Sequence, residues 1–78
     1  MNCEVTIKDK VYVVEDAWCI SKAVDIATSQ YYEDTGELIY NYDERIRVTP
    51  EGDDSMYFDK ETKDWEYCDK QGGNNFEN

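Results

Sequence analysis

The sequence predicts an α+β domain in which one helix packs on a mainly antiparallel sheet of four to five strands. Apolar residues alternate with polar ones near the N-terminus, recur at helical spacing in the middle of the chain, and alternate again toward the C-terminus. A helix with one apolar stripe and a sheet with one apolar face each bury that surface against the other. The expected order of elements is therefore ββαβββ.

A β-hairpin is expected at the start of the chain. In "CEVTIK", Cys3, Val5 and Ile7 point to one face of a strand, and the polar residues between them point to the other. The polar turn "KDK" follows, and "VYVVE" continues as the second strand.

A helix is expected over residues 17–33. Its apolar stripe follows i, i+3, i+4, i+7 and i+11 spacing and consists of Ile20, Ala23, Val24, Ala27 and Tyr31. Asp16 is expected to cap the N-terminus of this helix, and Gly36 suits the left-handed conformation that ends a helix.

β structure is expected to resume after Gly36 in "ELIYNYDERIRVT", as one long bent strand or as two strands with a break at Asp43–Glu44. Five apolar or aromatic residues lie at even-numbered positions there, as on one face of a strand: Leu38, Tyr40, Tyr42, Ile46 and Val48. The first two of them, together with Ile46 or Val48, are expected to pack against the helix.

Two short strands are expected in "SMYFD" and "DWEYC", around a turn at "KETK". The sheet face away from the helix then has no partner, and Ile39, Tyr57 and, in one arrangement, Tyr67 are expected on it. Residues 1–70 are expected to form a single compact domain, and residues 71–78 a flexible tail.

Charge is the most unusual property of the chain, whose 19 acidic and 8 basic residues give a net charge of −11. Such a surface repels nucleic acid and anionic membranes, and it attracts basic protein surfaces. Solubility alone is the alternative explanation. The N-terminus lacks a signal-peptide pattern, no apolar run is long enough to span a membrane, and the 3 cysteines are far apart, so a reducing, cytoplasmic location is expected.

No pattern for catalysis or cofactor binding is present. The chain contains no histidine, the usual general acid or base near neutral pH, and no nucleophile elbow, phosphate-binding loop or dinucleotide motif. A calcium-binding loop starting at Asp59 fails, because Lys63 and Lys70 occupy ligand positions and Asp64 replaces the glycine of the turn. The protein is therefore expected not to be an enzyme, and to have no cofactor and no metal site.

Acidic and aromatic residues are concentrated between positions 55 and 70, next to further acids at 51, 53 and 54. The candidate partner-binding residues are Glu51, Asp53, Asp54, Asp59, Glu61, Asp64, Trp65 and Glu66. Carboxylates at this density resemble a row of phosphates, and an aromatic anchor beside them is typical of protein interfaces. The alternative is a solvated sheet edge whose charges discourage aggregation. For the hairpin alone, the two interpretations have equal weight.

A small acidic chain without histidine, in which a strand is followed by a helix with an "SKAVDIA" alanine stripe and then a meander, resembles small phage-encoded inhibitors. Anti-CRISPR proteins and inhibitors of host RNA polymerase or restriction enzymes belong to this group. The resemblance covers residues 5–68 at the level of pattern and includes no diagnostic motif. It implies stoichiometric binding to a basic nucleic-acid channel in the host cytoplasm, in some members with dimerisation.

The first functional hypothesis is therefore a non-catalytic nucleic-acid mimic that inhibits a host defence (CRISPR or restriction) or transcription complex. Its partner would be a basic protein surface, with no direct contact to nucleic acid or membrane, and a homodimer is left open. The second hypothesis is a structural or adaptor domain that binds through the open sheet face. The third is a ubiquitin-like precursor that ends at Gly73 after processing, because a β-β-α-β order leads here to "QGG".

Overall fold

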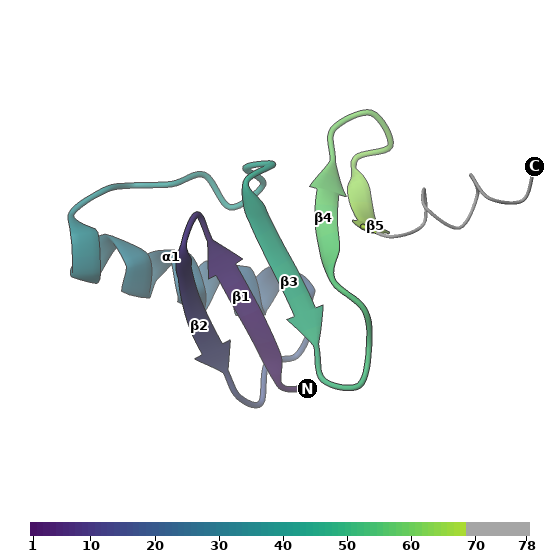
Figure 1. Cartoon of the computed structure of the whole chain (residues 1–78), viewed down its shortest axis with the longest axis horizontal. Coiled ribbons are helices and arrows are strands. Elements are labelled where there is room, and N and C mark those ends of the chain that lie inside the picture. The colour runs from purple at the N-terminus through teal and green to yellow at the C-terminus, as the bar shows by residue number, and fades with distance from the viewer. Residues whose placement is uncertain (69–78) are drawn as a thin grey trace, which may run out of the picture.

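A computed structural model describes residues 1–68, in which one helix packs on a five-stranded antiparallel sheet (Figure 1). The predicted α+β class is confirmed. The elements are β1 (Cys3–Ile7), β2 (Lys10–Val14), α1 (Ile20–Thr35), β3 (Ile46–Pro50), β4 (Met56–Asp59) and β5 (Asp64–Tyr67). The predicted tail at 71–78, with the processing site at Gly73, lies outside the described residues.

The strand order is β2-β1-β3-β4-β5, and each neighbouring pair is antiparallel. β1 therefore lies between β2 and β3, although β3 follows in the chain only after the helix. α1 crosses β1, β2 and β3 on one face of the sheet, and the β4–β5 hairpin extends beyond it (Figure 1). Within residues 1–68, no helix is long and apolar enough to cross a membrane.

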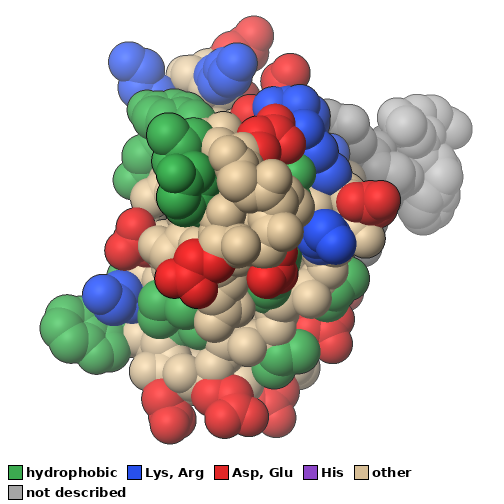
Figure 2. All heavy atoms as spheres, turned by 90° about the vertical axis from the view of Figure 1, so that its left-hand side faces the viewer, with side chains coloured by type: hydrophobic (Ala, Val, Ile, Leu, Met, Phe, Trp, Pro, Cys, Tyr) green, Lys and Arg blue, Asp and Glu red, His purple; other side chains and the backbone are tan. Residues whose placement is uncertain are grey.

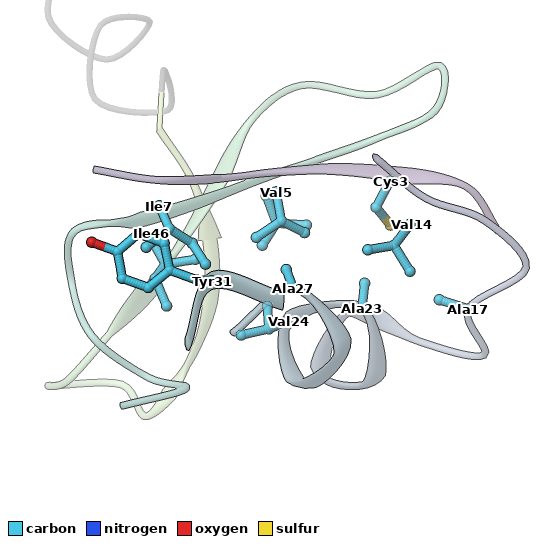
Figure 3. Close-up of a cluster of buried hydrophobic side chains, with 11 residues drawn as sticks. Cys3, Val5, Ile7, Val14, Ala17, Ala23, Val24, Ala27, Tyr31 and Ile46 are labelled. Carbon is cyan, nitrogen blue, oxygen red and sulfur yellow. The ribbon is translucent and has the colours of Figure 1, made fainter. Parts of the chain in front are cut away.

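The core lies between α1 and the first three strands (Figure 3). Ala23, Val24 and Ala27 are fully buried, Tyr31 is nearly so, and Ile20 packs at the margin, as the predicted stripe requires. Each of these strands contributes the alternate residues that point toward the helix: Cys3, Val5, Ile7, Val14, Ile46 and Val48. The predicted packing of the helix stripe on β3 is therefore confirmed.

The helix begins at Ile20, later than predicted, and Cys19 occupies the N-cap position that was expected for Asp16. The backbone N–H of Ala17 donates to the carbonyl of the N-terminal residue (2.8 Å), whose amino group donates back to the Ala17 carbonyl (2.7 Å). Because these bonds hold the chain beside the start of β1, the helix forms only after them. At the other end, Gly36 has a φ of 79° and ends the helix as predicted.

The segment 37–45 is not a strand, so the predicted β structure is confirmed only from the start of β3. Leu38 and Tyr40 are 80% and 70% exposed, and their predicted packing against the helix is wrong. Ile39 was expected on the open face but packs against the core. A turn closed by the N–H of Asp43 and the carbonyl of Tyr40 interrupts the alternation.

The register of the strands assigns residues to the open face. Met56 of β4 is buried on the helix side, so Tyr57 projects to the open face, as predicted. Tyr67 pairs directly with Met56 and lies on the helix side, so its expected place on the open face is wrong. The open face instead carries two valines of β2, Val11 and Val13, which are exposed.

Candidate functional site

The structure separates most of the predicted acidic residues into two groups at opposite ends of β4. The first group, in the β3–β4 turn, is Glu51, Asp53 and Asp54; the second, around the tip of the β4–β5 hairpin, is Asp59, Glu61 and Asp64. An extended chain rises roughly 3.3 Å per residue, so Cα atoms five residues apart lie roughly 16 Å apart. The acids therefore form two separate sites and not one continuous lattice.

Backbone hydrogen bonds hold the β3–β4 turn in place. The N–H of Glu51 donates to the carbonyl of Asn2 (2.8 Å), and the N–H of Asp53 donates to the carbonyl of Pro50 (3.0 Å). Gly52 has a φ of 78°, the left-handed value that the third position of a type II turn requires. These restraints keep the carboxylates of the turn on a short arc at one end of the sheet.

A hollow of about 600 Å³ lies beside this turn and is called the acidic hollow below. Its lining consists of Asn2, Cys3, Glu4, Val13, Thr49, Pro50, Glu51, Gly52, Asp53 and Asp54. Val13, which is 63% exposed, supplies apolar surface at the β2 edge of the hollow, beside Glu4. In the part of the chain that the structure describes, Glu4, Glu51 and Asp54 form no ion pair.

Neutral donors orient the carboxylate of Asp53. The hydroxyl of Tyr67 donates to its Oδ2 (2.9 Å), and the N–H of Asp54 donates to its Oδ1 (2.8 Å). The hydrogen bond to Asp53 raises the pKa of Tyr67 above its usual value, so the phenol stays protonated and keeps donating. The orientation of this carboxylate is therefore fixed without neutralising its charge.

Basic residues lie among the second acidic group. A hollow of about 600 Å³ near the hairpin tip is lined by Glu44, Arg45, Arg47, Tyr57, Phe58, Asp59, Lys60 and Glu61. In Figure 2, Lys and Arg side chains lie mostly in the upper half, toward the hairpin tip, whereas the lowest part carries acidic side chains only. Among residues 1–68, the lining of the acidic hollow contains no Lys or Arg, so this hollow is the more strongly negative of the two sites.

Trp65 and Glu66 lie on opposite faces of the hairpin. The half-buried Trp65 packs edge-to-face on Phe58 with ring centres 5.4 Å apart, and Tyr42 contacts Phe58 at 4.5 Å. Glu66 points to the open face and accepts a hydrogen bond from the hydroxyl of Thr62 (3.2 Å). Trp65 thus joins an aromatic cluster at the margin of the core, away from the acidic hollow.

Glu4 and Val13 belong to the acidic hollow but not to the site predicted from the sequence. The register pairs Glu4 with Val13 on one side and with Thr49 on the other. Glu4 occupies one of the alternate polar positions of β1, which indicates that it lies outside the core. Only the strand order brings it close to the β3–β4 turn. Its role in the hollow therefore depends on pairing between distant segments.

An ion pair fixes the chain just before β3. The Nε and Nη2 atoms of Arg45 donate to the two carboxylate oxygens of Asp43 (2.9 and 2.7 Å), and the Arg45 backbone N–H also donates to it (2.8 Å). The hydrogen bonds from the Arg45 side chain lower the pKa of Asp43 to about 2. The carboxylate of Asp43 is thus stabilised in its charged form by the folded state.

Asp43→Asn is expected to destabilise the protein at neutral pH by about 1–2 kcal/mol, after allowance for solvent screening. Because the folded-state pKa lies below the value of 3.8 for a free side chain, this stabilisation is complete above about pH 4. It is lost as the pH falls through about 2. Urea unfolding of the wild type and Asp43→Asn between about pH 2 and pH 7 should show their free energies of unfolding becoming equal at the acidic end, with Glu44→Gln as the control. A difference in free energy that stays constant with pH would contradict the stabilising role of the Asp43 carboxylate.

Within residues 1–68, no group of three or more potential ligands (His, Cys, Asp or Glu) is placed to hold a metal ion. A scan against protein-family models, a search of curated proteins and a search of solved structures found no match to this chain. Function is therefore inferred from the surface chemistry of the chain itself.

Proposed function

We propose that this protein is a non-catalytic binding protein whose acidic hollow receives lysine or arginine side chains of a partner. The partner surface is the nucleic-acid site of a host defence or transcription complex, which the protein occupies in the manner of phage-encoded inhibitors, in the host cytoplasm. One observation carries this proposal. Glu4, Glu51 and Asp54 line one hollow together with the exposed side chain of Val13, and none of the three forms an ion pair within the described residues.

This combination of groups suits a long cationic side chain. Lys and Arg bury their aliphatic stems on apolar surface while the charged head stays among polar groups. Here the exposed side chain of Val13 offers the apolar contact, and the carboxylates that line the same hollow offer charge-assisted hydrogen bonds. Surfaces that bind nucleic acid are rich in such side chains, because they neutralise phosphates.

The net charge supports the same kind of partner. Duplex DNA carries one charge per roughly 1.7 Å, so a charge of −11 corresponds to roughly five or six base pairs. This field attracts a basic protein surface over a distance, and it repels nucleic acid itself. Occupation of a partner's site requires no catalytic group, which agrees with a chain that contains no histidine.

An adaptor function through the open sheet face is the second candidate. The exposure of Val11 and Val13, at 57% and 63%, favours it, because paired apolar side chains on a solvent-facing sheet are typical of docking surfaces. Apolar docking depends little on salt, whereas binding by the acidic hollow weakens steeply as salt is added. Salt dependence therefore separates the two functions.

Competition with nucleic acid tests the proposal. The immobilised protein is exposed to a bacterial lysate at low salt, and retained proteins are eluted with short duplex DNA or RNA at constant ionic strength. We expect nucleic-acid-binding proteins to be released, and each of them, once purified, to bind either this protein or the duplex. A ternary complex with both, or binding that is unchanged by salt, would overturn the proposal and favour the adaptor function.

A further inference from the structure

β2 forms one edge of the sheet, and no strand among residues 1–68 pairs with its outer side (Figure 1). Edge strands are commonly protected by proline, by bulges or by charged residues in the strand. β2 has an uninterrupted register and the sequence KVYVV, in which Lys10 at the start is the charged residue. On the open face it carries Val11 and Val13, both exposed. Apart from Lys10 at its start, this edge therefore lacks the features that prevent pairing with another chain.

The backbone groups of Val11 and Val13 point away from β1. A two-residue turn joins β1 to β2, and such turns are closed by a pair of residues that exchange both backbone hydrogen bonds. Bonded pairs then alternate, so the N–H and C=O groups of the two valines face the free edge. The bond from the N–H of Glu51 to the carbonyl of Asn2 agrees, because it assigns the even-numbered residues of β1 to the β3 side.

We propose that a second copy of this chain pairs antiparallel with β2, across a two-fold axis at Tyr12, to form one continuous sheet. This register places Val11 of each copy opposite Val13 of the other, and their outward backbone groups exchange hydrogen bonds in both pairs. Directly opposed β-branched side chains also stabilise an antiparallel ladder. The two-fold axis makes the same surface serve both copies, as a symmetric dimer requires.

The charges around β2 favour a second copy as the occupant. Lys8 and Lys10 flank the start of the strand, whereas Glu15 and Asp16 follow its end. Antiparallel pairing lays the basic start of one copy beside the acidic end of the other. Asp9 in the turn offsets part of this attraction, and Lys8 also forms an ion pair within its own copy. The carboxylate of Asp34, which accepts a hydrogen bond from the hydroxyl of Tyr12 near the axis, adds repulsion. The attraction is therefore confined to the strand ends, and it arises only in the antiparallel orientation.

Salt affects this dimer and the proposed partner complex in opposite ways. Each copy carries a net charge of −11, so the copies repel each other at low salt and associate more readily when salt screens that repulsion. Because the axis is perpendicular to the sheet, both open faces lie on the same side and present two acidic hollows. The dimer does not rest on the proposed function, and its test requires no partner.

Sedimentation velocity across a range of protein concentrations, at low and at moderate salt, tests the proposal. We expect the wild type to dimerise at high concentration, more strongly at moderate salt. Val11→Lys/Val13→Lys and Val11→Glu/Val13→Glu should each stay monomeric, and an equimolar mixture of the two should form a heterodimer. Val11→Lys/Val13→Glu leaves the net charge unchanged and should dimerise without a second variant. In this dimer, the new lysine of each copy lies directly across from the new glutamate of the other, and the two attract each other. Leu38→Lys, at an exposed site away from β2, is the control.

A wild type that stays monomeric at every concentration and salt would overturn the proposal. So would a dimer that persists in both like-charge variants, or a mixture of those variants that fails to associate. Circular dichroism first checks that each variant is folded. Amide hydrogen exchange of the wild type gives a second measurement that needs no variant: exchange at Val11 and Val13 should slow several-fold with increasing concentration. Unchanged exchange at both positions would also overturn the proposal.

Discussion

Val24→Asp is expected to unfold the domain. Val24 is fully buried between α1 and the sheet, among apolar side chains that offer an aspartate no hydrogen-bond partner. Burying an unpaired carboxyl group costs several kcal/mol even when the group becomes protonated. A chain of this length has a total stability of roughly 4–12 kcal/mol, so the substitution removes most or all of it. Circular dichroism and urea titration should show the loss of the cooperative transition.

Two control variants separate charge burial from other effects at this position. Val24→Ala removes apolar contacts without adding a charge, and should cost roughly 1–3 kcal/mol while the fold persists. Gln30→Asp places the same carboxylate on the exposed side of α1 and should change stability by roughly 0.5 kcal/mol or less. A Val24→Asp protein that melts at the wild-type temperature would contradict the observed orientation of the helix.

The buried stripe of the helix was predictable because its spacing is a local property. Ala23, Val24 and Ala27 recur with the period of a single helix, whatever surface that helix packs against. The start of the helix was not predictable in the same way. Asp16 is a favourable capping residue, but hydrogen bonds between Ala17 and the N-terminal residue determine where the helix begins. Those bonds join segments that are distant in sequence.

The loop before β3 shows why alternation alone does not make a strand. Residues 37–45 alternate as a strand would, but β1 offers them no further pairing. Its five residues, Cys3–Ile7, are fully paired with Ile46–Pro50, and beyond Ile7 the chain turns into β2. A strand needs a neighbour for its backbone groups, so this segment forms a turn instead. The availability of a neighbour depends on strand order, which no local pattern reveals.

The candidate site was predictable to the same extent. Glu51 and Asp54 are close in sequence, so their clustering follows directly from the sequence. Glu4 and Val13 join them only because β1 lies between β2 and β3. Conversely, Arg47 comes to lie near the acids of the hairpin tip through the pairing of β3 with β4. The sequence thus predicts how many acidic residues the region contains. It does not predict that they are divided between two sites that differ in net charge.

Glu51→Lys/Asp54→Lys is expected to weaken partner binding at low salt by on the order of tenfold or more. Each exposed ion pair contributes roughly 0.2–1 kcal/mol, and a reversal replaces that attraction with a repulsion of similar size. Both side chains border the acidic hollow and neither forms an ion pair within the described residues, so the fold should be retained. Most of the loss should appear in the association rate, measured by surface plasmon resonance with a partner identified by competition.

Asp59→Lys/Glu61→Lys changes the net charge equally and should weaken binding less, because Arg47 and Lys60 lie beside those acids. Asp9→Lys/Glu33→Lys makes the same change at two exposed positions outside both hollows and serves as the control. Equal losses in all three variants would show that net charge, not the acidic hollow, determines affinity. Full affinity in Glu51→Lys/Asp54→Lys would exclude the hollow as the contact and transfer binding to the open sheet face. Only a loss concentrated in that variant supports a partner side chain seated among Glu4, Glu51 and Asp54.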